Sequence, residues 1–337
     1  MKDEKLAKEI SNLLKSMSGK TVAIVTHVGG DADAVGAAYV LKRILEENLG
    51  CATVHVHIPD EMSAQVRAMV NYLKLDVKSE AIGNVDAIIL VDIGSLEQVA
   101  EYFEDVMKMQ GKVYVIDHHT PPHGGYPQGF FVFFSERYRA LCELIMDVVR
   151  LMGIKLDELE AEALFLGIYY DTARLSLADS ETMANVCELV RLGVNPSKSV
   201  QAIEVPIDIS ERIARLKGAM RMSLYRAGEW LIATSQVNSF QTSVARAILS
   251  LGCHVSIVAG EYKNGVAVSM RSQQEFFAKT NINLGKDVAQ IVGARLGGYG
   301  GGHATAARAY CNSTPDEVIK LCLNLLEGLL GEKLSRV

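Results

Sequence analysis

Two absences limit where this protein can work. None of its six cysteines belongs to a Cys-x-x-Cys pair, and we expect them to be buried, small apolar residues in a reducing compartment. No apolar run approaches the ~20 residues that a membrane span requires, and the charged N-terminal stretch lacks the core of a signal peptide. We therefore expect a cytoplasmic protein without a membrane partner.

An excess of positive charge is also missing. The 34 Lys and Arg residues are outnumbered by 40 Asp and Glu residues, which gives a formal net charge of −6. This balance argues against a uniformly basic surface for long duplex nucleic acid, although it is compatible with a local basic cleft. The 337 residues, 49% of them hydrophobic, are enough for a well-packed protein of two domains.

The first half of the sequence contains a regular alternation of apolar strands and helical patterns. Strands are predicted at 21–25, 51–58, 86–91 and 112–118, with helical segments between them. This alternation is typical of an α/β domain with a doubly wound, mainly parallel sheet. The segment 136–193 has the pattern of several further helices.

Side chains of the kind that bind metals follow three of these strands. The carboxyl ends of parallel strands form the edge where ligands bind, so we expect these side chains to share one rim. Each alone could be a helix cap or a satisfied core histidine, but the coincidence at three strand ends favours a site. The residues on the predicted rim are His27, Asp31, Asp33, Asp92, His118 and His119.

Further aspartate and histidine residues are open to more than one interpretation. Asp171 ends an apolar helix at 162–172, where it either caps the following turn or adds a seventh polar group to the rim. His55 and His57 could form a ligand pair, but we interpret them as facing solvent or a neighbouring helix. Two more histidines are interpreted as surface or loop residues, namely His123 and His254.

The second half of the sequence indicates a separate domain. A helix stop followed by two proline-containing breaks predicts a linker at 194–208, between a domain at 1–193 and one at 209–337. The later domain alternates apolar and polar residues in several predicted strands, with helical patterns beside them. We therefore predict a smaller α+β domain.

A glycine-rich stretch at 297–303 precedes a predicted strand at 305–311. Glycine lets backbone N–H groups approach an anion closely, although glycine content alone favours a flexible turn. No Gly-Lys-Ser or Gly-Lys-Thr follows, which excludes a Walker loop. His303 at the end of the stretch and Arg271 at the end of another strand favour an anion-binding site over a flexible turn. We therefore predict a clamp for phosphate or ribose.

Together these motifs resemble the DHH superfamily of phosphoesterases, in the branch with a DHH-associated C-terminal domain and closest to its NrnA-type members. The first family motif spans His27 to Gly36 and keeps its histidine and both aspartates, with Gly30 in place of proline and Ala32 in place of glycine. The next motifs are matched by Asp92, by the name-giving Asp117-His118-His119 and by Asp171.

The resemblance extends to the glycine stretch. Gly300, Gly301, Gly302 and His303 match the C-terminal family motif, in which Arg308 stands in place of the final glycine. By this resemblance, these glycines and His303 bind substrate together with Arg271 and His119, in a cleft between the two domains. The expected substrates are nucleotides or short RNA and DNA oligonucleotides.

The resemblance also implies two metal ions, at the ~3.5–4 Å spacing of two-metal hydrolytic sites. One ion would be held by His27, Asp31 and Asp92, and the other by a set that shares Asp92 as a bridge. Mixed carboxylate and imidazole ligands suit Mn²⁺ better than Mg²⁺, with Mg²⁺ or Co²⁺ as substitutes. The second set consists of Asp33, Asp92, His118 and Asp171.

The implied mechanism gives the rim residues unequal roles. The two metals would activate a water as hydroxide for in-line attack on phosphorus, with Asp92 and His118 among the catalytic residues. Asp117 would orient the histidines. His119 would contact the phosphate or help to protonate the leaving group.

The expected function is therefore metal-dependent hydrolysis of short oligonucleotides (nanoRNA) or of 3′-phosphoadenosine 5′-phosphate. Alternatives with the same chemistry are a phosphodiesterase for cyclic or linear dinucleotides and a RecJ-like single-strand exonuclease. A different class is a non-catalytic replication partner, but such proteins typically lose the metal-binding carboxylates, which are present in this sequence. A homodimer is compatible with all of these expectations.

Overall fold

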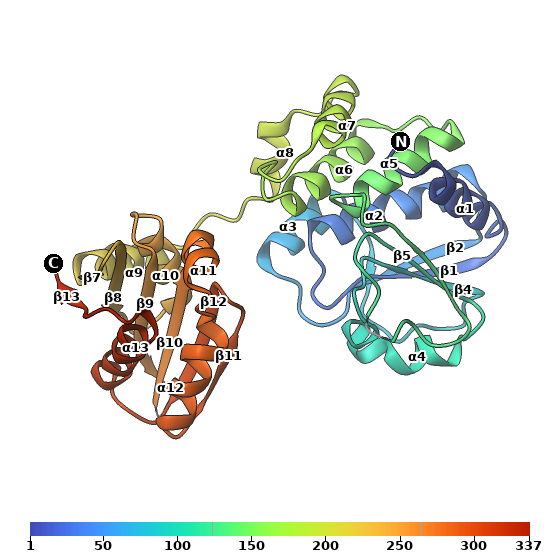
Figure 1. The fold of residues 1–337 in the computed structure, drawn as a ribbon. Coiled ribbons are helices and arrows are strands. Elements are labelled where there is room, and N and C mark those ends of the chain that lie inside the picture. Colours follow the sequence, from blue (N-terminus) through green and yellow to red (C-terminus); the bar gives the residue numbers. More distant parts are fainter. Residues whose placement is uncertain (123, 264) are drawn as a thin grey trace. The chain divides into compact units, whose positions relative to one another are not determined.

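The computed structural model describes residues 1–122, 124–263 and 265–337. Within them the chain forms two compact units, Met1–Val205 and Pro206–Val337 (Figure 1). The predicted surface or loop position of His123 lies outside the described residues. No helix in the described part of the chain has the length and apolar character needed to cross a bilayer.

The division between the units falls inside the predicted linker at 194–208. Much of that segment is helical, because Pro196–Ile203 forms helix α8. Asn195 caps this helix by accepting a hydrogen bond from the Lys198 amide, and Pro196 occupies its first turn. The ordered part of the first unit therefore extends further along the chain than the loop pattern predicts.

A six-stranded sheet forms the centre of the first unit. All its neighbouring strands are parallel, in the order β3-β2-β1-β4-β5-β6, which confirms the predicted doubly wound sheet. The chain proceeds toward one edge from β1 and toward the other from β4, so the switch point lies between these two strands. The strands are β1 Thr21–Val25, β2 Thr53–His57, β3 Val77–Lys78, β4 Ala87–Val91, β5 Val113–Asp117 and β6 Phe130–Phe134.

Both faces of this sheet are covered, which explains why its central strands are continuously apolar. All five residues of β4 are buried. Ile89 and Val91 belong to the core shared with α1, α2, α5 and α6, whereas Ile88 and Leu90 face the core beneath η2 and α4. The helical elements are α1 Glu4–Lys15, α2 Ala32–Arg43, η1 Ile44–Asn48, α3 Ala64–Tyr72, η2 Leu96–Tyr102, α4 Phe103–Lys108, α5 Leu141–Met152, α6 Glu158–Asp171 and α7 Ser180–Arg191.

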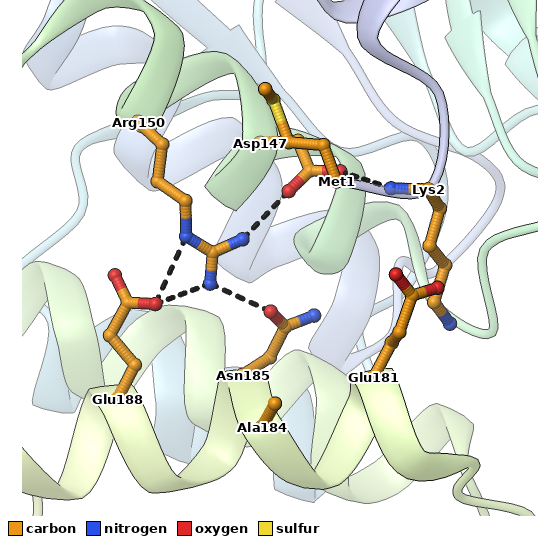
Figure 2. Close-up of a pocket in the computed structure, with 8 residues that line it drawn as sticks. All are labelled: Met1, Lys2, Asp147, Arg150, Glu181, Ala184, Asn185 and Glu188. Carbon is orange, nitrogen blue, oxygen red and sulfur yellow. Dashed lines mark hydrogen bonds and ion pairs between the residues drawn. The ribbon is translucent and has the colours of Figure 1, made fainter.

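The N-terminal residues are bound to helices α5 and α7. The Lys2 ammonium group, 4% exposed, lies 2.8 Å from a carboxylate oxygen of Glu143, and the Lys2 amide donates to Asp147. Arg150 connects Asp147 with Glu188 on α7 (Figure 2). These charge-assisted contacts fix α5 along its length, and the first turn of α5 forms part of the site described below.

The second unit is built on a seven-stranded, mainly antiparallel sheet in the order β11-β12-β10-β9-β8-β7-β13, which confirms the predicted α+β class. Only β8 and β9 are parallel neighbours in the described residues. Its strands are β7 Ser223–Ala227, β8 Trp230–Gln236, β9 Val255–Tyr262, β10 Gly265–Ser272, β11 Tyr299–Gly302, β12 Ala306–Cys311 and β13 Ser335–Arg336. Its helical elements are α9 Ile209–Met220, α10 Gln241–Leu249, α11 Gln274–Thr280, η3 Leu284–Ala289, α12 Gln290–Arg295 and α13 Pro315–Leu330.

The glycine stretch is a strand rather than the predicted loop. Residues Tyr299–Gly302 form β11 and pair with β12. A Cβ on Gly300 would lie 2.0 Å from the Ala289 carbonyl oxygen, and one on Gly302 would lie 2.4 Å from the Ala306 carbonyl oxygen. These glycines are therefore needed for close backbone packing, which the sequence pattern does not distinguish from an anion-binding turn.

Two histidines of the sequence analysis have buried environments. His57, 2% exposed, lies on β2 with its ring centroid 5.0 Å from that of Tyr102 in η2, in agreement with a position facing a neighbouring helical element. His254 lies in a bend directly before β9, in agreement with the predicted loop position, and it is partly buried, with its Nδ1 accepting a hydrogen bond from the Leu231 amide. Neither ring lies in the clusters of metal-ligand type among the described residues.

Candidate metal centre

The carboxyl ends of β1, β4 and β5 bring the predicted rim residues together at the switch point of the sheet. His27 follows β1, Asp92 follows β4, and Asp117 ends β5. Asp92 adopts a left-handed backbone conformation with φ of 59°, which turns the chain sharply at the end of the strand. This conformation is uncommon for a residue with a side chain, and such strain is frequent at functional sites.

The first donor set lies between β1 and helix α2. Asp31 caps α2, since one of its oxygens accepts hydrogen bonds from the Asp33 and Ala34 amides at 2.9 and 3.0 Å. Its other oxygen lies 3.7 Å from Nε2 of His27. The His27 Nδ1 atom lies 3.0 Å from the Val28 carbonyl oxygen. This contact places the ring proton on Nδ1 and leaves the lone pair of Nε2 free to bind a metal ion. His27, Asp31 and Asp92 offer ligand atoms within 4.8 Å of one another.

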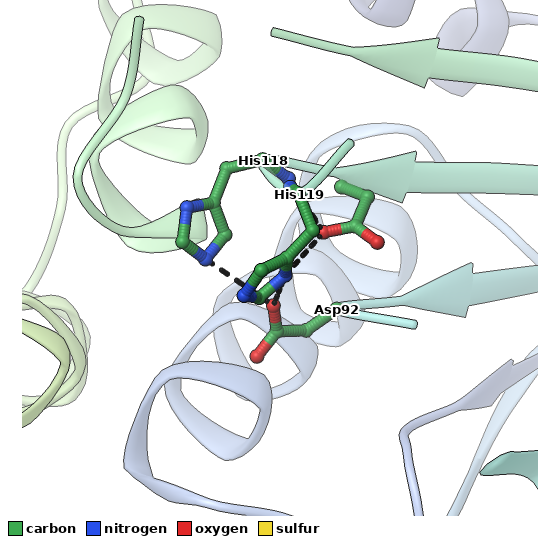
Figure 3. Close-up of side chains that lie close together, drawn as sticks. Asp92, His118 and His119 are labelled. Atoms are coloured by element: carbon green, nitrogen blue, oxygen red, sulfur yellow. Dashed lines mark hydrogen bonds and ion pairs between the residues drawn. The ribbon is translucent and has the colours of Figure 1, made fainter. Parts of the chain in front are cut away.

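The second donor set is more deeply buried and combines three elements. Nε2 of His118 lies 3.8 Å from an oxygen of Asp33 and 3.4 Å from an oxygen of Asp171. The same nitrogen is 3.5 Å from Oδ1 of Asp92 (Figure 3). Asp33, His118 and Asp171 offer ligand atoms within 4.8 Å of one another, and Asp92 lies next to both sets.

Asp33 is held in position by hydrogen bonds from helix α5, which the sequence does not predict. It is 1% exposed, and its carboxylate accepts hydrogen bonds from the amides of Leu141 and Cys142 in the first turn of α5. A helix N-terminus carries unpaired N–H groups and a partial positive charge, both of which favour an anion. The sequence signal was the start of an apolar helix after Arg139, but nothing in it indicates which carboxylate that helix would meet.

Two glycines allow helices α2 and α6 to approach each other at the site. A Cβ on Gly36 would lie 2.5 Å from the Ala163 carbonyl oxygen. A Cβ on Gly167 would lie 2.4 Å from the Cys142 sulfur and 2.8 Å from an oxygen of Asp33. Because Gly167 precedes Asp171 on the same helix by one turn, this close approach places Asp171 opposite Asp33.

Asp117 organises the turn that carries the two histidines. One of its oxygens accepts hydrogen bonds from the backbone amides of His118 and His119 at 2.6 and 2.9 Å, and lies 2.9 Å from Nδ1 of His119. The His119 ring is 52% exposed and lies beside the buried His118 ring, with 4.1 Å between their centroids. Asp117 is therefore placed to orient His119, whose predicted contact with the substrate stays a prediction.

Two buried polar atoms at the centre of the site lack a hydrogen-bond partner among the described residues. They are Oδ1 of Asp92 and Nε2 of His118. Leaving such atoms unpaired in a protein interior is costly, and native structures rarely do so without a reason. A divalent cation would satisfy both atoms, and carboxylate oxygens with imidazole nitrogens are suitable ligands for it. The residues present therefore fit the predicted metal ions.

The negative charge of the site raises the pKa values of its histidines. Asp117 and Asp92 raise the pKa of His119 to about 11. Burial lowers the pKa of His118, but the carboxylates of Asp92 and Asp33 outweigh it and raise that pKa to about 9. Both rings are thus protonated at neutral pH in the metal-free protein. A metal ion at Nε2 of His118 must displace that proton.

The pKa values of the carboxylates in the site shift in two directions. Burial raises the pKa of Asp171 to about 6, and burial together with the charge of Asp92 raises the pKa of Asp33. The α5 amides act against this shift for Asp33, because they hydrogen-bond its ionised form. Burial would also raise the pKa of Asp92, but His118 and His119 hold it below its ordinary value. A bound cation would favour the ionised form of all three groups.

An open hollow of about 510 Å³ adjoins both donor sets. This volume is within the range of small-ligand sites, ~300–1,000 Å³. Five of its lining residues are predicted site residues, and three others, which come after the ends of β4 and β5, are not predicted from the sequence. The five are His27, Asp31, Asp92, His119 and Asp171, and the missed ones are Gly94, Gln98 and Thr120.

The predicted substrate-binding residues of the second unit lie on its sheet. Arg271 is half-buried on β10 and donates to the Met270 carbonyl oxygen, and His303 is exposed directly after β11. Gly301 pairs with Arg308 on β12. Their contact with substrate, and a cleft between the two domains, stay predictions.

Residues 21–168 match the family described as DHH family, N-terminal domain. The match begins at β1 and ends within α6, and it includes every predicted metal ligand except Asp171, which lies just beyond it. An exopolyphosphatase-related protein from Bacteroides fragilis has a similar crystal structure, with a TM-score of 0.70 and 18% identity over 98% of this chain and 97% of that one. At this identity the likeness shows a shared fold.

Two relatives were found by sequence. The uncharacterized protein MJ0988 of Methanocaldococcus jannaschii is 26% identical over 318 residues, which are 93% of this chain and 95% of that protein. The cyclic-di-AMP phosphodiesterase GdpP of Geobacillus thermodenitrificans is also 26% identical, over 90% of this chain but 47% of its own length. The chain thus spans about half of the second relative. The first unit of this chain is thus similar to the N-terminal domain of the DHH family, and the family's motif residues gather at one rim of its sheet.

Proposed function

We propose that this protein is a metal-dependent phosphoesterase that hydrolyses short oligonucleotides or 3′-phosphoadenosine 5′-phosphate. The observation that carries the proposal is that two buried atoms, on Asp92 and His118, have no hydrogen-bond partner among the described residues at the point where two donor sets meet. The phosphodiesterase activity in the name of a relative supports phosphate esters as the class of bond that is cleaved, a phosphodiester in a short oligonucleotide and a phosphomonoester in 3′-phosphoadenosine 5′-phosphate. An open hollow beside the donors leaves room for a phosphate ester.

The two donor sets would each hold one divalent ion, with Asp92 between them. The mixture of imidazole and carboxylate donors favours Mn²⁺ over Mg²⁺. When bound, such ions supply Lewis-acid activation of a water molecule and of the phosphate oxygens. The protein keeps the donors in place through the α5 amides on Asp33 and the cap that Asp31 forms on α2.

His119 would supply the proton for the leaving oxygen. Its ring lines the hollow, and in the metal-free protein the neighbouring carboxylates of Asp117 and Asp92 raise its pKa to about 11. Asp117 accepts the Nδ1 proton and both backbone amides, which holds the ring in one orientation. A positioned acid of this kind accelerates bond cleavage by roughly 10²–10⁴-fold.

A second candidate is hydrolysis of cyclic or linear dinucleotides. Two relatives named cyclic-di-AMP phosphodiesterase, from Geobacillus thermodenitrificans and Bacillus subtilis, align with 90% and 89% of this chain. Such dinucleotides, like short oligonucleotides, would present a phosphodiester to the same donor sets. The two candidates differ in the shape of the nucleotide and share the proposed chemistry at phosphorus.

The test is a hydrolysis panel with Mn²⁺ that covers 3′-phosphoadenosine 5′-phosphate, RNA of two to five nucleotides, longer single strands and cyclic dinucleotides. We expect hydrolysis of the short substrates, its loss in EDTA, and a loss of more than ~100-fold in Asp92→Asn, since a ligand matters at least as much as its supporting residues. Asp76→Asn is the matched control, because Asp76 precedes edge strand β3 at the end of the sheet opposite the rim. Full activity of Asp92→Asn, or activity unaffected by EDTA, would contradict the proposal.

A further inference from the structure

One face of the C-terminal sheet carries three neighbouring tyrosines that the proposed chemistry does not use. Tyr310 on β12 pairs across the sheet with Tyr299 on β11, and their ring centroids are 5.0 Å apart. Tyr262, at the end of β9, lies on the other side of Tyr310 at 5.3 Å. Strand register thus groups residues that lie far apart in the sequence.

These tyrosines are open to ligands. Tyr299 is 69% exposed and Tyr262 is 44% exposed, although large aromatic side chains are usually well covered. All three line a hollow of about 370 Å³, together with Lys263, Gly298 and Asn312 among other residues. A hollow of this size is large enough for a small aromatic ligand.

Glycine keeps the adjacent surface of β11 free of side chains. Gly301 lies two residues from Tyr299 on the same face, and a Cβ added to it would meet no atom within 4 Å. Gly298 is tightly packed, because a Cβ on it would lie 1.8 Å from the Tyr310 carbonyl oxygen. A flat ligand can therefore approach the tyrosines and the backbone of β11 closely.

Positive charge lies beside the tyrosines on the same face. The Arg308 guanidinium carbon is 5.5 Å from the Tyr310 ring centroid, and the Lys263 ammonium nitrogen is 5.5 Å from that of Tyr262. Arg308 pairs with Ser269 on β10, two residues before Arg271, so both arginines occupy this face in adjacent rows ~7 Å apart. In the described part of the second unit, ion pairs to carboxylates involve Arg215 and Lys279 and none of these cations.

The arginines are not neutralised by neighbouring groups. Burial and the charges of Arg246 and Arg308 lower the pKa of Arg271, as expected where cations gather without a counter-charge. The hydroxyl of Ser269, 0% exposed, has no hydrogen-bond partner among the described residues and lies in register with Arg308. Guanidinium groups that form no ion pair with a carboxylate in the described part of the second unit suit an anion such as a phosphate.

We propose that this face binds single-stranded oligonucleotides, with bases stacked on the tyrosines and phosphates held by the arginines. Exposed aromatic rings combined with cations form the general platform for single strands, because every base has a face that can stack. The inference rests on the proposed function for the choice of substrate class, and it sharpens that class toward oligonucleotides rather than mononucleotides. The face consists of Tyr262, Tyr299, Tyr310, Arg271 and Arg308.

The test measures binding of a labelled RNA pentanucleotide to the full chain by fluorescence anisotropy, in EDTA so that hydrolysis plays no part. We expect Tyr299→Ala to weaken binding by about 5- to 100-fold and Tyr299→Phe, which keeps the ring, to bind like the unmodified protein. Arg308→Gly should lower the dependence of log affinity on log salt concentration by about 0.7, the value for one phosphate contact with a single strand. Thermal melting of each variant checks that it is folded.

The outcomes separate this inference from the proposed function. Unchanged binding and salt dependence in folded Tyr299→Ala and Arg308→Gly would overturn the inference even if the hydrolysis panel succeeds. Failure of hydrolysis with intact, tyrosine-dependent binding would overturn the proposed function alone. If Tyr299→Ala instead changes the molar mass in light scattering without altering RNA affinity, the face joins two copies of the chain and the inference is wrong.

Discussion

At the scale of single residues, the Asp117 carboxylate is surrounded by three N–H groups and fixes the geometry and charge of the turn that carries the two histidines. Asp117 holds the amides of His118 and His119 and the Nδ1 atom of His119. An asparagine at this position would keep an oxygen for the amides and lose the charge. The substitution Asp117→Asn therefore separates the geometric role of this residue from its electrostatic role.

The ion pair between Asp117 and His119 makes the stability of the metal-free protein decrease as the pH becomes alkaline. The pKa of His119 is about 11 in the folded chain, against about 6.5 for an unperturbed histidine, so the folded state binds its proton more tightly. The stabilisation is complete below about pH 6.5 and is lost as pH rises toward 11. We expect the free energy of unfolding, measured with denaturant in EDTA, to fall less between pH 7 and pH 10 in Asp117→Asn than in the unmodified protein. Equal pH dependence in both would contradict this coupling.

Metal binding should release protons for a related reason. His118 has a pKa of about 9 and, as a proposed ligand, would bind metal as a neutral ring, so its proton must leave when an ion binds at pH 7.5. We expect calorimetric titration with Mn²⁺ to give heats that vary with the ionisation enthalpy of the buffer, corresponding to about one proton or more released. Affinity should also rise with pH between 6 and 9, about tenfold per unit for each proton. Heats independent of the buffer would show that His118 is not a ligand.

At the scale of elements, the contact between α2 and α6 decides whether the second donor set exists. Gly167 leaves no room for a side chain, because its Cβ would meet the Cys142 sulfur at 2.4 Å and an Asp33 oxygen at 2.8 Å. Gly328 in α13 is a helical glycine with nothing within 4 Å of the same added atom. The two positions form a matched pair for testing this contact.

We expect Gly167→Ala to cost about 1–3 kcal/mol of stability, as overpacking in a core does, and to weaken Mn²⁺ binding by tenfold or more. The reason is that the added methyl group pushes α6 away from Asp33 and moves Asp171 with it. Gly328→Ala should leave Mn²⁺ binding unchanged and stabilise its helix by up to ~1 kcal/mol. Denaturant unfolding and calorimetric titration measure both quantities. Unchanged Mn²⁺ affinity in Gly167→Ala would mean that α6 does not position a ligand.

At the scale of the whole molecule, the two units have separate cores and one of them carries the proposed metal site. The first unit has its core on both faces of the parallel sheet, and the second has its own around the mixed sheet. A ligand that binds one folded unit stabilises that unit by mass action. Metal binding should therefore stabilise the first unit and leave the stability of the second unit unchanged.

We expect scanning calorimetry to show two transitions, of which Mn²⁺ raises only one. At a metal concentration 100 times the dissociation constant the stabilisation is ~2.7 kcal/mol, which corresponds to a rise in Tm of about 5–10 °C for a unit of this size. EDTA should reverse the rise, and Asp92→Asn should abolish it. A single transition that moves as a whole with Mn²⁺ would show that the units unfold together.

Much of the site could be predicted from sequence, because the direction of a strand in a parallel sheet fixes the edge at which the next residues lie. Parallel strands present their carboxyl ends at one edge, so a ligand directly after a strand reaches that edge whatever the details of packing. His27, Asp92 and His118 were placed together on this argument, and in the structure they lie there. Asp31 followed as the cap of the next helix.

Other parts depended on contacts between elements far apart in the chain. The α5 amides on Asp33 and the approach of α6 to α2 are set by helix packing, which no local pattern encodes. The strand β11 was mistaken for a loop, because glycine favours both turns and close backbone packing.

By itself, then, the sequence determined the class of fold, the family motifs and the donor residues, because periodicity and strand direction are local properties. Only the tertiary structure decided which donors face each other, and which atoms of Asp92 and His118 have no hydrogen-bond partner among the described residues. It alone also brought Tyr262, Tyr299 and Tyr310 onto one face, because strand register is fixed by long-range pairing and not by the residues of any one strand.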